Sequence, residues 1–364
     1  MQSDPIKVMI VDDSPSVRRM FASLIADEAD MELFAQAEDP FVAVEQMRSV
    51  LPDVILLDLH MPRMDGLTFL RKIMSQRPIP VVVISSLAQE GSETMMKALE
   101  YGAVEVLEKP RPRTPDERQE MVIRISDVIR AAAQSRRTKR RPATPIKPVG
   151  ERHTADIILP KLSHPPRVAG PPLIAIGAST GGTEALKAVL ETLPPTLPPI
   201  AIVQHMPRAF TAAFAERLDR YSALEVFEAS EGRTLGRGQA VLAQGDRHLL
   251  LGRHGTGYRV QLNNGPAVAR HRPSVDVLFR SVSQVVGGSA LGIILTGMGD
   301  DGAAGMAEMR AGGARTLAQD EASCAVYGMP RAAMETGAAE KAVPLSQVAE
   351  QIIRWAAAQE RAGV

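Results

Sequence analysis

Short apolar runs alternate with amphipathic stretches along residues 1–133. The runs predict strands, of which the second is the weakest, at 8–11, 32–37, 54–57, 81–84 and 104–107. Apolar positions between the runs recur at helical spacing, and the last such stretch covers 116–133. Alternating strands and helices are typical of βαβ units, in which helices cover both faces of a parallel sheet. We therefore expect residues 1–133 to form a doubly wound α/β domain.

The same pattern returns over residues 173–364. Parallel-type strands are predicted at 173–176, 200–204, 291–295 and 316–318, with helices such as 183–193 between them. Gly-rich turns separate three further runs, at 239–243, 248–251 and 258–262, which predict an antiparallel meander. The second half is thus expected to be a doubly wound, mostly parallel α/β domain that carries an antiparallel meander.

Residues 134–172 differ in composition from both halves. They are rich in proline and basic residues and have little apolar periodicity, so they predict a linker that buries little surface. The basic cluster at 136–141 fits a solvated linker better than a site for an anionic partner. A length of 364 residues agrees with two domains joined in this way.

Charge and cysteine content exclude several classes of protein. Lys and Arg number 42, as do Asp and Glu, so net charge gives no reason to expect nucleic acid or an anionic membrane as a partner. The single cysteine, Cys324, cannot form an internal disulfide or a Cys-type zinc site. The N-terminus lacks the layout of a signal peptide, and the apolar runs are too short to span a membrane. We expect a soluble cytoplasmic protein that does not insert into membranes.

Acidic side chains follow two of the predicted strands in the first half. Asp12 and Asp13 come directly after the strand at 8–11, and Asp58 comes directly after the strand at 54–57. The carboxyl ends of parallel strands meet at one crevice, where these carboxylates would repel one another without a cation. Oxygen-rich sites of this kind suit Mg2+. The alternative is that these residues only cap a helix and form a turn.

A cation and hydroxyl groups are predicted at the same rim. Lys109 ends a later strand, and Ser85 and Ser86 end the strand between. A carboxylate, a hard cation, an ammonium and a hydroxyl together can bind and accept a phosphoryl group.

These segments, VDDSPSVRR, DVILLDLHMPRMDGL, VVVISS and LEKP, resemble the receiver domain of response regulators. The resemblance implies that Asp58 accepts a phosphoryl group from a histidine kinase and that Asp12 and Asp13 hold Mg2+ with it. It also implies that Lys109 contacts the phosphoryl group and that Ser85, rather than Ser86, supplies the switch hydroxyl.

A glycine-rich turn opens the second half. The segment IAIGASTGGT predicts a strand, a tight turn and a helix start, with Ser179 exposed in the turn. The letters fit the G-x-S-x-G pattern of an activated serine. A dinucleotide site fits less well, because Ser179 stands where the second glycine of that fingerprint is needed. A serine that merely caps the helix is the other alternative.

A nucleophilic serine needs a base and an orienting acid. Among seven histidines, His205 ends the predicted strand at 200–204, and His271 is the reserve candidate. Another Gly-rich turn after the strand at 291–295 carries Asp300 and Asp301, and spacing does not choose between them. The order Ser, His, Asp differs from that of α/β-hydrolases, so a different hydrolase fold is expected.

The segments GASTGGTEAL, VQHMP, HRPSVDVLF, ILTGMGDDGAAGM and AQDEASCAVYGMP resemble the catalytic domain of the chemotaxis protein-glutamate methylesterases. The resemblance implies Ser179 as nucleophile, His205 as base and Asp301 as acid, since the acid directly precedes the last glycine of the GMGxDG motif. It implies an oxyanion-hole donor near Met298 and no cofactor for the ester chemistry.

This second resemblance also implies a function. The expected activity is hydrolysis of glutamate methyl esters on chemotaxis receptors, with deamidation of receptor glutamines, under inhibition by the unphosphorylated receiver and activation by a chemotaxis histidine kinase. A phosphorylation-controlled binding adaptor would need no serine chemistry. A DNA-binding output would need a compact helical module, which the mixed pattern of the second half does not predict.

Overall fold

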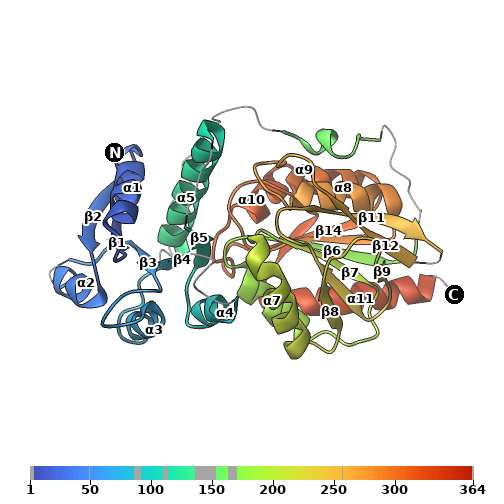
Figure 1. Cartoon of the computed structure of the whole chain (residues 1–364). Coiled ribbons are helices and arrows are strands. Elements are labelled where there is room, and N and C mark those ends of the chain that lie inside the picture. The colour runs from blue at the N-terminus through green and yellow to red at the C-terminus, as the bar shows by residue number, and fades with distance from the viewer. Residues whose placement is uncertain are drawn as a thin grey trace. The chain divides into compact units, whose positions relative to one another are not determined.

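The computed structural model describes residues 4–48, 50–85, 92–109, 114–135, 153–162, 170–255 and 257–362. The chain divides into two compact units, Met1–Pro142 and Ala143–Val364 (Figure 1). Each unit has its own sheet and its own buried core.

The first unit is built on a five-stranded parallel sheet of order β2-β1-β3-β4-β5. Its strands are β1 (Ile6–Val11), β2 (Met31–Ala37), β3 (Val54–Asp58), β4 (Val81–Ser85) and β5 (Glu105–Glu108). Its helices are α1 (Pro15–Ala26), α2 (Pro40–Gln46), α3 (Gly66–Gln76), α4 (Ser92–Glu100) and α5 (Pro115–Ser135). The expected doubly wound fold is confirmed, including the weakly predicted second strand. The strand order changes direction between β1 and β3, so their carboxyl ends border the crevice where such sheets bind ligands.

The second unit holds a seven-stranded sheet of order β15-β14-β13-β6-β7-β10-β8, in which all pairings are parallel. The strands are, in chain order, β6 (Leu173–Ala178), β7 (Ile200–Gln204), β8 (Glu225–Glu228), β10 (Gln239–Leu242), β13 (Ala290–Ile294), β14 (Arg315–Gln319) and β15 (Lys341–Val343). The helices are α6 (Gly182–Leu190), α7 (Arg208–Tyr221), α8 (Val275–Val285), α9 (Ala303–Ala311), α10 (Met329–Glu335) and α11 (Leu345–Ala362).

A small antiparallel sheet of order β11-β12-β9 stands beside the large one. It consists of β9 (Thr234–Leu235), β11 (His248–His254) and β12 (Gly257–Asn263). The antiparallel element was therefore predicted correctly, but the placement of 239–243 in it was wrong. Those residues form β10, which pairs in parallel with β7 and β8. Its fully buried Ala240, Val241 and Leu242 are typical of a parallel strand covered on both faces.

Close packing around Val275 joins the start of α8 to the central sheet. A Cβ at position 177 would lie 2.2 Å from Cγ1 of Val275, and one at position 302 would lie 2.6 Å from the same atom. Only glycine fits at either position without displacing Val275. The start of α8 is therefore held between the end of β6 and the start of α9.

Residues 153–162 lie within the predicted linker, yet they pack on the second unit. They contain a short 3-10 helix, η1 (Ala155–Ile157). Ala155 is buried in a small apolar cluster with Leu250, Val268, Ala269 and Val277. We call residues 153–162 the docked segment.

Across the described parts of the chain, the helices are each too short or too polar to traverse a lipid bilayer.

Candidate functional site

Ser179 directly follows β6 and sits in a tight turn before α6. Its N–H donates to the carbonyl of Thr296 at 3.0 Å, and its own carbonyl accepts from the Gly182 N–H at 2.7 Å. Gly181 has a left-handed φ of 77°, which a residue with a Cβ rarely adopts. A Cβ at position 181 would also meet the Cβ of Ala325 at 2.5 Å. The glycine-rich sequence is thus required for the turn that presents Ser179.

His205 occupies the corresponding position after β7, which pairs with β6. Its N–H donates to the carbonyl of Ala178 at 3.1 Å. The buried Gln204 amide links the two turns, because its Nε2 donates to the carbonyls of Ser179 at 2.9 Å and of His205 at 3.2 Å. The structure therefore brings Ser179 and His205 together at neighbouring strand ends.

Asp301 binds the imidazole of His205. The distance from His205 Nε2 to Asp301 Oδ2 is 2.8 Å, and Asp301 is only 1% exposed. Burial raises the pKa of this carboxyl, but its interactions with His205, the hydrogen bond first among them, outweigh burial, and the pKa falls below its ordinary value. An ionised Asp301 keeps the imidazole proton on Nε2.

The tautomer set by Asp301 leaves Nδ1 of His205 as the basic nitrogen. Nδ1 is buried and has no hydrogen-bond partner among the described residues. Within those residues, no hydrogen bond joins the side chains of Ser179 and His205. Catalytic hydrogen bonds often form only once substrate is bound, so this geometry is compatible with proton transfer between them.

The N-terminus of α8 holds Asp301 from the other side. Its carboxylate accepts from Ser274 Oγ at 2.8 Å, from the Val275 N–H at 2.8 Å and from the Asp276 N–H at 3.1 Å. Asp300, the alternative that spacing left open, is exposed. The structure places Asp301 on His205, and the residues at the start of α8, from Ser274 to Asp276, provide its donors.

Asp276 is a buried carboxylate that the sequence did not single out. Its Oδ1 accepts from the N–H groups of Gly302 at 3.0 Å and Gly305 at 2.8 Å, so it caps α9, the helix that follows Asp301. Burial and the nearby charge of Asp301 raise its pKa. The N–H groups at the start of α8 thus bind Asp301, which precedes α9. In return, Asp276 of α8 accepts from N–H groups at the start of α9.

Two further histidines support this arrangement. His248 is fully buried; its Nδ1 accepts from the Ser274 N–H at 3.2 Å, and its Nε2 donates to the carbonyl of Pro266 at 2.9 Å. Burial lowers its pKa, which favours the neutral ring that these two bonds require. His271, the reserve candidate for the base, stacks on His205 with ring centroids 3.7 Å apart and an angle of 8° between the rings.

The backbone before Met298 contacts the nucleophile. A Cβ at position 297 would lie 2.7 Å from the Cβ of Ser179. In the described part of the chain, the Met298 N–H donates to no other group. A backbone donor is therefore available one residue beyond Gly297, the position where an added Cβ would meet Ser179.

The acidic side chains of the first unit also lie together. Asp12, Asp13 and Asp58 each offer one oxygen, and these oxygens lie within 4.8 Å of one another. Lys109 Nζ lies 3.0 Å from Asp12 Oδ2 and 2.7 Å from Asp58 Oδ2. Burial and the charge of Asp58 raise the pKa of Asp12. Burial lowers the pKa of Lys109, but the two carboxylates outweigh it and raise that pKa.

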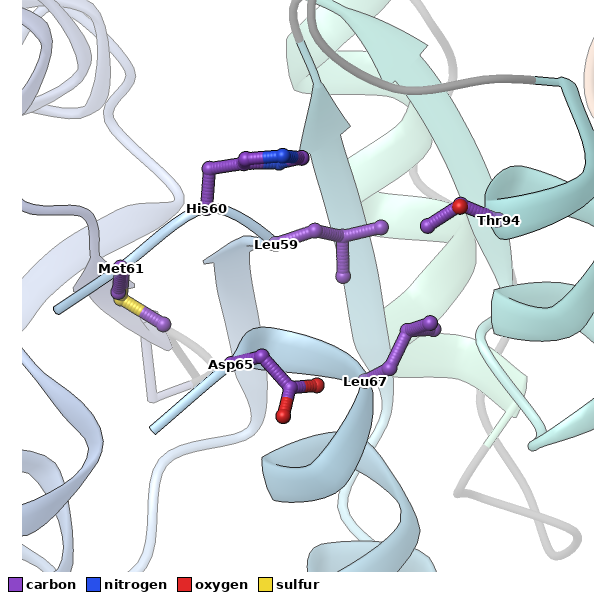
Figure 2. A pocket seen from close by; sticks show the side chains of 6 residues that line it. All are labelled: Leu59, His60, Met61, Asp65, Leu67 and Thr94. Carbon is purple, nitrogen blue, oxygen red and sulfur yellow. The ribbon is translucent and has the colours of Figure 1, made fainter. Parts of the chain in front are cut away.

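The surroundings of Asp58 include a hydroxyl and a surface pocket. Ser85 is fully buried at the end of the neighbouring strand β4, whereas Ser86 lies outside the described residues. The His60 N–H donates to Asp58 Oδ1 at 3.3 Å. Figure 2 shows the pocket that begins one residue beyond Asp58, lined by Leu59, His60, Met61, Asp65, Leu67 and Thr94.

Comparison with known proteins covers both units. The CheB methylesterase family matches residues 174–352, and the response regulator receiver domain matches residues 8–120. The protein-glutamate methylesterase/protein-glutamine glutaminase 3 of Geobacter metallireducens is 52% identical over 350 residues, which are 96% of this chain and 98% of that relative. A protein-glutamate methylesterase/protein-glutamine glutaminase of Cereibacter sphaeroides is 56% identical over 352 residues, 96% of this chain and 95% of the relative.

The catalytic half also matches a solved structure. The Thermotoga maritima CheB methylesterase catalytic domain has a TM-score of 0.50 and 35% sequence identity, over 51% of this chain and 99% of that domain. Fold and matches together define a class of protein, a hydrolase joined to a response-regulator receiver. The chain belongs to the CheB methylesterase family, whose members in chemotaxis act as protein-glutamate methylesterase and protein-glutamine glutaminase. The function expected from the sequence is thereby confirmed at this level.

Gly297→Ala should slow the reaction of Ser179. The added Cβ would meet Sδ of Met329 and would lie 2.7 Å from the Cβ of Ser179, so Met329 and the nucleophile must both shift. We expect the rate of covalent labelling by a fluorophosphonate, and kcat, to fall about 10- to 100-fold. Gly236→Ala is the matched control, because its Cβ would approach only Gln239 Oε1, at 3.8 Å. Equal labelling rates in the two variants would contradict the prediction.

Asp276→Asn should make stability less dependent on pH. The pKa of Asp276 is raised above its ordinary value of 3.8 in the folded protein. The contribution of the protonated group to stability is therefore fully present below pH 3.8, and it is lost as the pH rises through the folded pKa. An amide oxygen can still accept from Gly302 and Gly305 without this loss. Urea unfolding should therefore show the variant gaining on the wild type from pH 5 to pH 8, by on the order of 1 kcal/mol or more. Glu191→Gln, which neutralises an exposed carboxylate of the same unit, should show no such gain.

Proposed function

We propose that Ser179, His205 and Asp301 are the catalytic triad and that the substrates are methyl-esterified glutamates and glutamines of chemotaxis receptors. The observation that carries this proposal is the His205–Asp301 bond, which leaves Nδ1 as the basic nitrogen beside the turn of Ser179. We further propose residues 1–133 as the receiver domain and 173–364 as the catalytic domain, in a cytoplasmic protein whose ester chemistry needs no cofactor.

In the acylation step, His205 Nδ1 takes the proton of Ser179 Oγ as the oxygen attacks the side-chain carbonyl. The imidazolium that forms is stabilised by the buried carboxylate of Asp301. It then protonates the leaving group, so that methanol departs from an ester or ammonia from an amide, and an acyl-enzyme remains. In the second step Nδ1 takes a proton from water, which attacks the acyl group; the proton returns to Ser179 and glutamate is released.

Charge develops on the carbonyl oxygen in both steps. The Met298 N–H is the proposed oxyanion donor, since its backbone adjoins Ser179 and the donor has no other acceptor among the described residues. A donor of this kind contributes about 3 to 4 kcal/mol to stabilising the transition state. The N-terminus of α6, directly after the Ser179 turn, adds a favourable dipole for the same charge.

The receiver provides control in this proposal. Asp58 accepts a phosphoryl group from a chemotaxis histidine kinase, and the unphosphorylated receiver inhibits the catalytic domain. The carboxylate oxygens of Asp12, Asp13 and Asp58, of which only Asp13 is exposed, fit a hard divalent cation. Mg2+ bound there would neutralise charge on the phosphoryl oxygens. Lys109, already 2.7 Å from Asp58, would contact the phosphoryl group, and Ser85 would supply the switch hydroxyl.

Ser179→Ala should abolish turnover because no other group can form the acyl-enzyme. We expect kcat for demethylation and for deamidation of receptor peptides, followed by mass spectrometry, to fall on the order of 10^4-fold or more. Ser346→Ala removes an exposed hydroxyl of the same unit and should be indistinguishable from the wild type. Turnover that survives in Ser179→Ala would show that the nucleophile is a different group.

Asp58→Asn should remove stimulation by a small phosphodonor without lowering basal activity. In the wild-type chain we expect acetyl phosphate with Mg2+ to raise the esterase rate, and excess EDTA to prevent that rise. Asp27→Asn, which neutralises an exposed carboxylate of the same unit, should respond as the wild type does. A phosphodonor response in Asp58→Asn equal to that of the wild type would refute the assignment.

A further inference from the structure

The imidazole of His205 is fixed at one edge and on one face. Asp301 holds the Nε2 edge, and a single hydrogen bond leaves the ring able to rotate about it. The ring of His271 lies 3.7 Å away and nearly parallel, at 8°, so it restricts that rotation. Proton transfer from Ser179 depends on the direction of Nδ1, which the ring plane determines.

We propose that His271 is a positioning residue that sets the ring plane of His205, and that the docked segment, residues 153–162, holds His271 in place. This inference rests on the proposed role of His205 as the base. It assigns a catalytic purpose to part of what the sequence presents as a linker.

His271 is carried by a tight hairpin. The N–H of Val268 donates to the carbonyl of His271 at 3.0 Å, and the N–H of His271 donates back to Val268 at 2.8 Å. The two residues between them, Ala269 and Arg270, have φ of 50° and 69°. Such left-handed conformations favour glycine or asparagine in two-residue turns. A turn made of Ala and Arg is strained, and it persists only with support from its surroundings.

The docked segment supplies that support. The N–H of Ala269 donates to the carbonyl of His153 at 3.0 Å. The side chain of Ala269, 6% exposed, packs in one cluster with Ala155 and Val277. The strained turn is therefore held both by a hydrogen bond from the docked segment and by apolar contact with it.

The docked segment is in turn anchored to α8. The buried Arg280 donates through Nη1 to Asp156 Oδ1 at 2.8 Å and to the carbonyl of Leu159 at 2.9 Å. Gln284 Nε2 donates to the carbonyl of Pro160 at 2.7 Å. The first turn of α8 also binds Asp301. The docked segment therefore contacts both α8 and the hairpin of His271, the two elements that orient His205. Figure 1 shows the segment beside α8.

Variants of the whole chain at position 271 test the stacking. His271→Ala should lower kcat and the rate of fluorophosphonate labelling of Ser179 about 10- to 100-fold, with KM unchanged, because a positioning residue acts on His205 and not on the substrate. His271→Phe keeps an aromatic face without ring nitrogens and should restore most of the loss. His254→Ala, at an exposed histidine that contacts Arg259, is the control and should match the wild type. Rates are expressed per folded molecule, measured by circular dichroism.

Two results would overturn the role of His271. Wild-type rates in His271→Ala would show that stacking is dispensable. Equal losses in His271→Ala and His271→Phe would show that a ring nitrogen, rather than the aromatic face, is needed.

Variants in the docked segment test its support of the hairpin. Ala155→Asp places a charge in the buried cluster and should lower kcat as His271→Ala does. Leu162→Asp adds the same charge at a position that is 43% exposed and should have no effect. If the segment acts through His271, the double variant Ala155→Asp/His271→Ala should be no slower than His271→Ala alone. Unchanged turnover in Ala155→Asp, or losses that multiply in the double variant, would refute the coupling.

Ser179→Ala and His205→Ala, measured alongside, separate this inference from the proposed function. If both are inactive while His271→Ala is as fast as the wild type, the inference fails and the triad stands. If either retains turnover, the triad itself fails.

Discussion

The ionised carboxylate of Asp301 is the group on which the catalytic half depends. It is almost completely buried, and an unpaired charge in such a place would be strongly destabilising. Four donors compensate for its lost hydration: His205, the Ser274 hydroxyl and two N–H groups of α8. The same contacts that keep the charge stable also fix the tautomer of His205. Folding and catalysis therefore both require Asp301 to be ionised and fully hydrogen-bonded.

The hydrogen bonds of Asp301 also depend on how the backbone around it packs. For α8 to bring its N–H groups to the carboxylate, Val275 must pack against the end of β6 and the start of α9. Glycines at 177 and 302 leave the space that this packing needs. Asp276 then caps α9, which follows Asp301 in the chain. Two helix starts and two carboxylates thus form one closed arrangement, in which each helix positions the acid of the other.

Much of the fold and of the site could be predicted from the sequence, because the carboxyl ends of parallel strands lie at the same edge of a sheet. Asp12, Asp58, Ser179 and His205 each follow a clear apolar run, and each lies at the expected edge. Whether Asp300 or Asp301 meets the histidine depends on one turn, which periodicity does not describe. Asp276 and the stacking of His271 depend on contacts between distant segments, so no local pattern indicates them. The 239–243 strand was assigned to the wrong sheet because a buried apolar run does not indicate which strand it pairs with.

The docked segment escaped prediction for a different reason. Besides the Asp156 side chain and the small Ala155, its attachment relies on main-chain carbonyls of His153, Leu159 and Pro160, which the residue type does not indicate. One consequence concerns chimeras. A designer who grafts a new sensor onto this hydrolase would naturally place the junction just before β6, where the first strand begins. Such a graft would discard residues 153–162, and with them the contacts to α8 and the support of the turn that carries His271. The part of the chain to transfer instead begins at residue 153. A junction upstream of that residue keeps the docked segment together with the catalytic residues.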